Sequence, residues 1–181
     1  MNSIIKRYKI PFLISLVTGI AMVALVGEEY WLNIVLTISG ALVGMSFLDL
    51  EYILFAYLVD PLSETALEVK KYVESKKLFG FVQFLNESEY KFKELSLRII
   101  FFQVLLVIFA SYIITTNAFV FVQGLTLSVL ANLLYAQMVE FQDTKTLQRW
   151  FWIYSGDLSR NLYIVYMFVM LILLVLQYSF L

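Results

Sequence analysis

Five long apolar runs constrain the fold of this chain more than any other feature of its sequence. Each run is close to the ~20 residues that a helix needs to cross the ~30 Å hydrocarbon core of a bilayer. They cover residues 10–26, 31–48 (or on to 59), 97–116, 118–139 and 162–181. With 61% hydrophobic and 15% charged residues, a soluble domain of 181 residues could not hide its apolar surface, because small domains have too much surface for their volume. The sequence therefore predicts an all-α integral membrane protein, a single domain over 1–181 with five transmembrane helices.

The segments between the runs complete this prediction. Residues 27–30 and the region around 117 leave room only for tight turns, so runs one and two, and runs three and four, should form antiparallel helical hairpins. The longer segments, 60–96 and 141–161, predict short helical extensions outside the membrane. Within the first of them, Asp60 and Pro61 predict a helix start, with an N-cap residue followed by proline at the first helical position.

The positions of the basic residues predict the orientation. All 13 Lys and Arg residues lie before the first run, between the second and third, or between the fourth and fifth. With five spans these regions share one face of the membrane, and the opposite face carries Glu28 and Glu29 but no basic residue. Since loops rich in Lys and Arg stay in the cytoplasm, we expect a multi-pass protein of the cell membrane with its N-terminus inside and its C-terminus outside.

The first run could alternatively belong to a secretory signal, because basic residues precede an apolar stretch. Residues 22–27, Met-Val-Ala-Leu-Val-Gly, make a poor small-x-small cleavage site. We therefore interpret 10–26 as a span.

Asp49 and Glu51 interrupt the apolar character at the end of the second run. The 18 residues 31–48 would cover about 27 Å as a helix, so both carboxylates should emerge at the cytoplasmic boundary, at headgroup level or paired to loop lysines. Two residues apart, they point about 200° away from each other on a helix and cannot hold one ion together. The alternative is an ion site within the membrane, since ionisable residues inside lipid are usually functional.

Two further groups of residues in the spans are candidates for function. Gly40 and Gly44 form a Gly-x-x-x-Gly pattern that permits close helix approach. Their partner is either a second copy of the chain or another span of the same chain, and the sequence leaves both open. The second group is a candidate polar vestibule near the cytoplasmic side, against which stands ordinary hydrogen bonding between helices. It consists of Asn132, Gln137, Glu140 and Asp49.

Aromatic residues at the ends of the runs are typical of membrane interfaces, where amphipathic rings sit at headgroup depth. The candidate interfacial anchors are Trp31, Trp150, Trp152 and Tyr154.

The chain contains no histidine and no cysteine. This composition excludes a His-ligated haem, thiolate or imidazole zinc sites, a Cys nucleophile and a Ser-His-Asp triad. We predict no catalytic residues, no metal site and no cofactor. The net charge of −1 predicts no nucleic-acid partner, because duplex binding relies on excess positive charge.

Three functions remain open from the sequence. The first is a non-catalytic subunit or scaffold in the lipid bilayer, acting through helix packing in a homo-oligomer or a larger membrane complex. The second is an oligomeric pore or channel for ions or small solutes. The third is a transporter or membrane enzyme that uses carboxylates on the cytoplasmic side, namely Asp49, Glu51, Glu140 and Asp143.

Overall fold

The computed structural model describes residues 2–27, 29–75, 77–88, 92, 97–116, 118–151, 154 and 158–181. Over these residues the regular structure is entirely helical, which confirms the all-α prediction for this part of the chain. The helices are α1 (Asn2–Val26), α2 (Trp31–Phe47), α3 (Leu50–Leu54), the π-helical turn η1 (Phe55–Val59), α4 (Glu64–Glu74), α5 (Leu78–Ser88), α6 (Ile100–Thr115), α7 (Val120–Thr144), the 3-10 turn η3 (Gln148–Phe151) and α8 (Arg160–Ser179).

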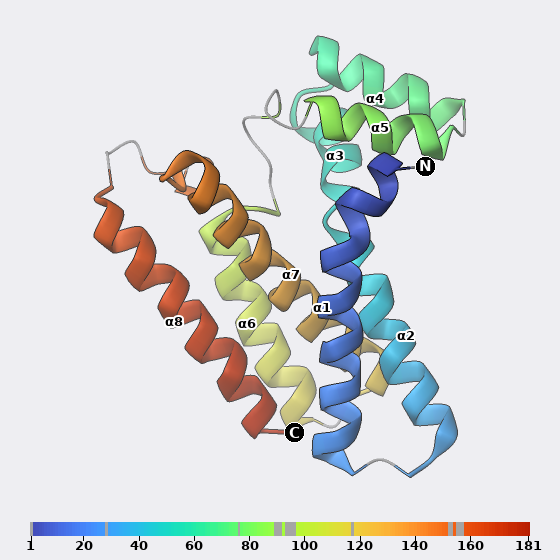
Figure 1. Ribbon diagram of the computed structural model, residues 1–181, viewed down its shortest axis with the longest axis vertical. Helices are drawn as coiled ribbons and strands as arrows, with labels where there is room; N and C mark the ends of the chain where they lie inside the picture. Colours follow the sequence, from blue (N-terminus) through green and yellow to red (C-terminus); the bar gives the residue numbers. More distant parts are fainter. Residues whose placement is uncertain are drawn as a thin grey trace.

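Helix α7 lies at the centre of the bundle and packs on the other four long helices. The α1–α2 hairpin lies on one side of it, and α6 and α8 lie on the other (Figure 1). The short helices α3, α4 and α5 gather at the end of the bundle where the N-terminus lies, and the C-terminus lies at the opposite end (Figure 1). The outer faces of the long helices are apolar and exposed, as at Val165, Phe168 and Val175 of α8, each 60% exposed or more.

Three helical segments are long and apolar enough to cross a membrane: Arg7–Val26 of α1, α7 and α8. A fourth candidate consists of α2 together with Leu50–Val59, with a bend of 46° between the two parts. Helix α6 is apolar but has only 16 residues. Of the five predicted spans, three or four therefore meet the requirements of length and composition.

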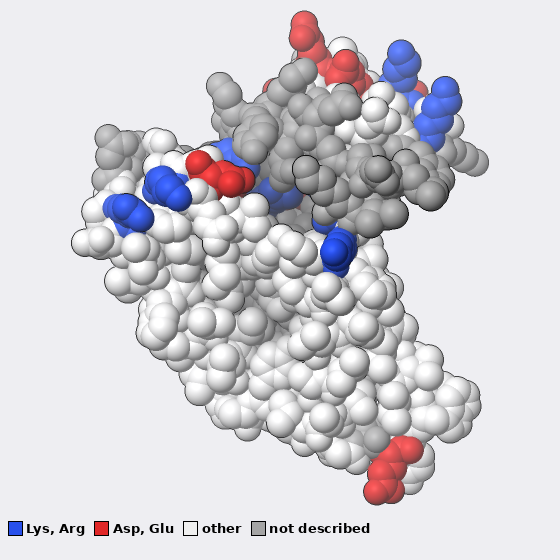
Figure 2. All heavy atoms as spheres, viewed as in Figure 1, with Lys and Arg blue, Asp and Glu red and all other residues white. Residues whose placement is uncertain are grey.

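Charged side chains divide the molecule along its length. Figure 2 shows basic and acidic side chains at the end formed by α3–α5 and the α7–α8 connection, an uncharged belt over the long helices, and acidic side chains at the opposite end. The described acidic residue at that opposite end is Glu29, in the turn between α1 and α2. An apolar belt of this kind is what a bilayer requires, because charged groups at its centre are costly.

Gly40 and Gly44 pack against α7 of the same chain. A Cβ at Gly40 would overlap the carbonyl oxygen of Phe121, and one at Gly44 would lie 2.8 Å from the Cβ of Ser128. The partner helix also carries a glycine, since a Cβ at Gly124 would overlap the carbonyl oxygen of Thr37. Of the two partners left open by the sequence, the structure shows a span of the same chain.

The short helices enclose a small core of their own at the charged end. Rings from α3, η1, α5 and residue 92 meet there, with Phe92 in edge-to-face contact with Tyr52 and Phe55 at centroid distances of 4.8 and 5.3 Å. Ala66 and Val69 bring α4 onto this core. The predicted extension at 60–96 therefore contains α4 and α5 packed as one layer.

The predicted start of α4 at Asp60 is wrong. The backbone N–H of Asp60 instead donates to the carbonyl of Phe55 and closes η1. Ser63 is the N-cap, because its hydroxyl accepts from the backbone N–H of Ala66 at 3.3 Å. Both residues have side chains suited to capping. Asp60 belongs to the end of the π-helical turn, so the N-cap position falls to Ser63.

Candidate functional site

A pocket of about 230 Å³ lies at the charged end, between α1, α7 and the end of α2. One face of α7 forms its long wall, with Asn132, Ala136, Glu140 and Thr144 at four-residue intervals. These residues stack along one side of a helix and span about 18 Å. Apolar side chains line the opposite wall, among them Pro11 of α1 and Met45 of α2. The pocket thus runs from the apolar body of the bundle to its charged end.

Asp49 ties α1 to the end of α2 at the side of this pocket. It forms an ion pair with Arg7 at 2.9 Å and accepts a hydrogen bond from the hydroxyl of Tyr8. The Arg7 and Asp49 side chains are only 13% and 16% exposed. Because the pair is largely withdrawn from water, removing either partner would leave an uncompensated charge in a poorly solvated position.

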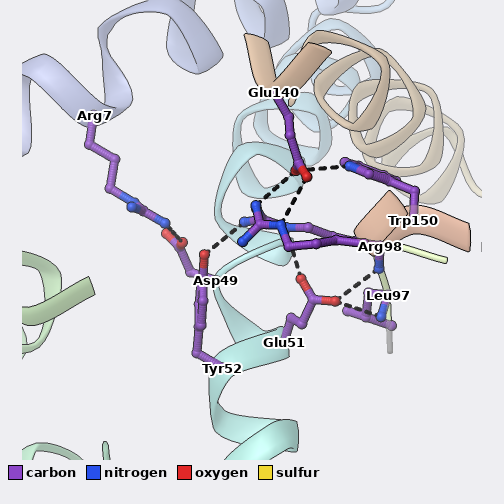
Figure 3. A network of polar contacts seen from close by, with 9 residues as sticks. Arg7, Asp49, Glu51, Tyr52, Leu97, Arg98, Glu140 and Trp150 are labelled. Atoms are coloured by element: carbon purple, nitrogen blue, oxygen red, sulfur yellow. Dashed lines mark hydrogen bonds and ion pairs between the residues drawn. The ribbon is translucent and has the colours of Figure 1, made fainter. Parts of the chain in front are cut away.

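Glu51 is fully buried and holds the start of the α6 segment. Its Oε1 accepts from the backbone N–H groups of Leu97 at 2.7 Å and Arg98 at 2.8 Å, and its Oε2 forms an ion pair with the Arg98 side chain at 3.0 Å. Arg98 also donates to the hydroxyl of Tyr52 at 2.9 Å. Figure 3 shows Arg98 reaching both Tyr52 and Glu51, while Asp49 faces Arg7.

Asp49 and Glu51 therefore have separate cations, as their angular separation on a helix requires. The loop lysines that the sequence suggested as partners are not the partners of these two pairs, which both use arginine. Arginine suits such sites because its planar guanidinium offers five donors and is less strongly hydrated than an ammonium group.

Glu140 forms the third ion pair around the pocket. Arg149 binds it through two nitrogens, Nε at 2.9 Å and Nη2 at 2.8 Å, and the indole N–H of Trp150 donates to it at 3.0 Å (Figure 3 labels Glu140 and Trp150). This forked geometry is stronger than a single contact. It fixes the η3 turn onto the end of α7.

The structure brings three of the four candidate vestibule residues to one pocket: Asp49, Asn132 and Glu140. The fourth, Gln137, faces α6 and α8, where its Nε2 donates to Oε1 of Gln103 at 2.9 Å and the hydroxyl of Tyr166 contacts the same oxygen. Five residues separate Asn132 from Gln137, which is about 140° around a helix. In the sequence, Asn132 and Gln137 are grouped because they lie at a similar position along the same run. They face different neighbours because they point in different directions around the helix.

The deep end of the pocket is closed by a polar cluster from α1 and α7. Nδ2 of Asn132 donates to Ser15 Oγ at 2.9 Å, and the Ser128 hydroxyl donates to the same oxygen at 2.8 Å. Within the described residues, Oδ1 of Asn132 has no hydrogen-bond partner although Asn132 is 2% exposed. An unsatisfied buried acceptor costs on the order of 1–3 kcal/mol, so the bonds to Ser15 and Ser128 come at the expense of this oxygen.

The candidate anchors have different surroundings. Trp31 is 73% exposed and Tyr154 60% exposed, whereas Trp150 is 1% exposed and packs with Leu147 and other buried residues. Trp152 lies outside the described residues.

The sequence alone does not single out four residues of the pocket, Arg7, Tyr8, Arg98 and Arg149, or Ser15, which bonds to Asn132 of the pocket wall. In the sequence, the arginines contribute only to the prediction of membrane orientation. The spacing Ser15-x-x-x-Gly19 on α1 was a usable signal, since small residues at this interval mark close helix contacts.

Comparisons with protein-family models, with curated proteins and with solved structures find no match to this chain.

Proposed function

We propose that the chain is a multi-pass protein of the cell membrane that crosses the bilayer five times, with its charged end in the cytoplasm. Three helices and the bent α2–η1 segment supply four spans. Helix α6 supplies the fifth, because its 16 mostly apolar residues give about 24 Å, close to the hydrocarbon thickness. Five crossings put all 13 cations on one side, as the positive-inside rule favours.

We further propose that the protein binds a lipid in the pocket between α1, α2 and α7. The observation that carries this proposal is the mixed lining of the pocket. Pro11, Met45 and Ala136 lie along it with Asp49 and Glu140, beside Arg7 and Arg149. A lipid at the inner boundary of the bilayer has the same order of parts, an apolar acyl chain followed by a charged headgroup. The recess visible below the charged end in Figure 2 supports entry from the side.

The other functions suggested by the sequence have less support. A pore needs polar side chains that face a path, but Gln103 and Gln137 bond to each other and Asn132 bonds to Ser15. Carboxylate chemistry needs several accessible acids, but Asp49, Glu51 and Glu140 each pair with an arginine, which leaves Asp143 alone of the four candidates.

A role as a subunit or scaffold is the second candidate. Gly40 and Gly44 do not support it, since they are used within the chain. Exposed leucines in and just before α4 do support it: Leu62 is 87% exposed and Leu67 56%. Such residues on the cytoplasmic layer favour contact with another protein. The mass of the purified protein in mild detergent tests this role, and a strict monomer without co-purifying protein contradicts it.

Lipid binding is tested by filling the pocket. Ala136→Trp places an indole in the pocket and should remove a lipid that the wild-type protein retains through detergent exchange. The measurement is native mass spectrometry of protein released from nanodiscs. Leu105→Trp is the matched control, because Leu105 lies on the outer face of α6 and is 48% exposed. Loss of lipid from the wild type and both variants at the same detergent concentration contradicts the proposal.

A further inference from the structure

We infer that the pocket selects lipids whose headgroup carries a positively charged nitrogen, and that Asp143 receives this nitrogen. The inference rests on the lipid-binding function proposed above and adds the class of lipid.

The arginines of the pocket already have carboxylates beside them. Arg7 pairs with Asp49 at 2.9 Å, Arg98 with Glu51 at 3.0 Å, and Arg149 with Glu140 at 2.8 Å. The carboxylate members are 16%, 0% and 10% exposed. An anionic headgroup would have to displace a carboxylate that the fold holds in place, and would leave that carboxylate next to its own charge. Breaking a poorly solvated ion pair in this way is unfavourable.

Asp143 is the carboxylate of the pocket wall that is not paired with an arginine. It lies three residues beyond Glu140 on α7, on a neighbouring part of the same helix face, and it is exposed. Within the described part of the chain, Asp143 makes no hydrogen bond and no ion pair. The nearby Lys145 points elsewhere, since its backbone is left-handed with φ of 61° and its Nζ donates to the carbonyl of Gln142 at 2.6 Å.

The balance of charge around the pocket is therefore negative. Three carboxylates line it, Asp49, Glu140 and Asp143, and the buried Glu51 lies behind the lining. The three guanidiniums compensate Asp49, Glu51 and Glu140, which leaves Asp143 in excess. Two tyrosines, Tyr8 and Tyr135, also line the pocket. Aromatic rings attract cations through their faces. Both features favour a positively charged nitrogen at the mouth of the pocket.

A zwitterionic headgroup satisfies these conditions better than an anionic one. In phosphatidylethanolamine and phosphatidylcholine the nitrogen compensates the phosphate of the same molecule, so the headgroup needs no additional arginine. Phosphatidylglycerol brings a net negative charge and nothing for Asp143 to bind. The expected order of retention is therefore zwitterionic over anionic lipid.

The experiment uses nanodiscs that contain equal parts of phosphatidylethanolamine, phosphatidylcholine and phosphatidylglycerol. Native mass spectrometry then reports which lipid the released protein retains. We expect the wild type to retain the zwitterionic lipids over phosphatidylglycerol by about fivefold, the factor that one charge contact of modest strength gives. Asp143→Asn should reduce this preference to about twofold or less, and Asp143→Lys should reverse it. Glu68→Gln is the matched control on exposed α4 and should keep the wild-type preference.

Two results overturn the inference and leave the proposed function standing. One is wild-type enrichment of phosphatidylglycerol in the retained lipid. The other is an unchanged preference in Asp143→Asn while Ala136→Trp still removes the lipid. Retention of no lipid of any class by the wild type overturns the proposed function and the inference with it.

Discussion

The two sides of α7 are packed by different means. Towards α2, glycines bring two backbones together, and a Cβ at Gly40 or Gly124 would overlap a carbonyl oxygen of the other helix. Towards α6, larger side chains separate the helices and buried amides join them, as where Gln137 donates to Gln103 at 2.9 Å. Helix α8 joins α6 in the same way, through Gln177 and Ser111 at 2.9 Å. Apolar burial does little to associate helices in lipid, so each side needs a specific device. On the side facing α2 this device is close backbone packing at glycines, and on the side facing α6 and α8 it is side-chain hydrogen bonding.

The pocket lies on the side packed by shape. Its long wall is α7 and its opposite wall is α1 with the end of α2. Close packing at Gly40 and Gly44 therefore fixes the distance between α2 and α7. The ion pair between Arg7 and Asp49 fixes α1 to the end of α2. Within the described part of the chain, no residue of helix α6 or helix α8 lines this pocket. The comparison predicts that changes on the two sides affect stability and lipid binding differently.

The largest effect is expected from Gly40→Ala. The new methyl group would meet the backbone of Phe121, which cannot move without separating α2 from α7. Overpacking against backbone should lower the free energy of unfolding by about 3 kcal/mol, and lipid retention should fall with it. Unfolding by SDS in mixed micelles measures the change.

Gly19→Ala is the control for Gly40→Ala. Its Cβ would lie 3.2 Å from both the Cβ of Ala41 and the Cα of Ile38, tight contacts that a shift of α1 by a few tenths of an ångström relieves. Since alanine also favours helix over glycine by roughly 1 kcal/mol, the net change should be close to zero. Equal losses in the two variants would contradict the special role given to the backbone contact between α2 and α7 at Gly40.

A smaller effect is expected from Gln137→Leu. The change removes the hydrogen bond to Gln103 and should cost about 1 kcal/mol, the usual value for such bonds between membrane helices. Lipid retention should not change, because Gln137 lies outside the pocket. The chain contains no cysteine, so introduced cysteine pairs can report the α6–α7 and α2–α7 contacts separately, and only the first should loosen.

Gln148→Leu, at an exposed position of η3, is the matched control for Gln137→Leu and should leave the unfolding free energy within about 0.5 kcal/mol. A loss of lipid retention in Gln137→Leu equal to that in Ala136→Trp would show that the two sides are not independent.

The sequence predicts the helices well because a bilayer imposes both their length and their composition. Gly40 and Gly44 were identified as a close-packing pair, but their partner depends on tertiary structure, and the matching pair Gly124 and Ser128 on α7 lacked a visible cue beyond its spacing. The position of Gln137 outside the pocket was predictable from its angle to Asn132. The burial of Glu51 was not, since it depends on Arg98, 47 residues further along the chain.

The account depends most on the charged end lying in the cytoplasm and the opposite end lying outside. Single cysteines at Glu29, between α1 and α2, and at Gln142, near the end of α7, test this directly, because native cysteine is absent. A membrane-impermeant thiol reagent applied to intact cells should label Glu29→Cys at once and Gln142→Cys only after the membrane is permeabilised. Labelling of Gln142→Cys in intact cells, or of both positions from the same side, would contradict the five-span arrangement and the position of the lipid pocket at the inner face.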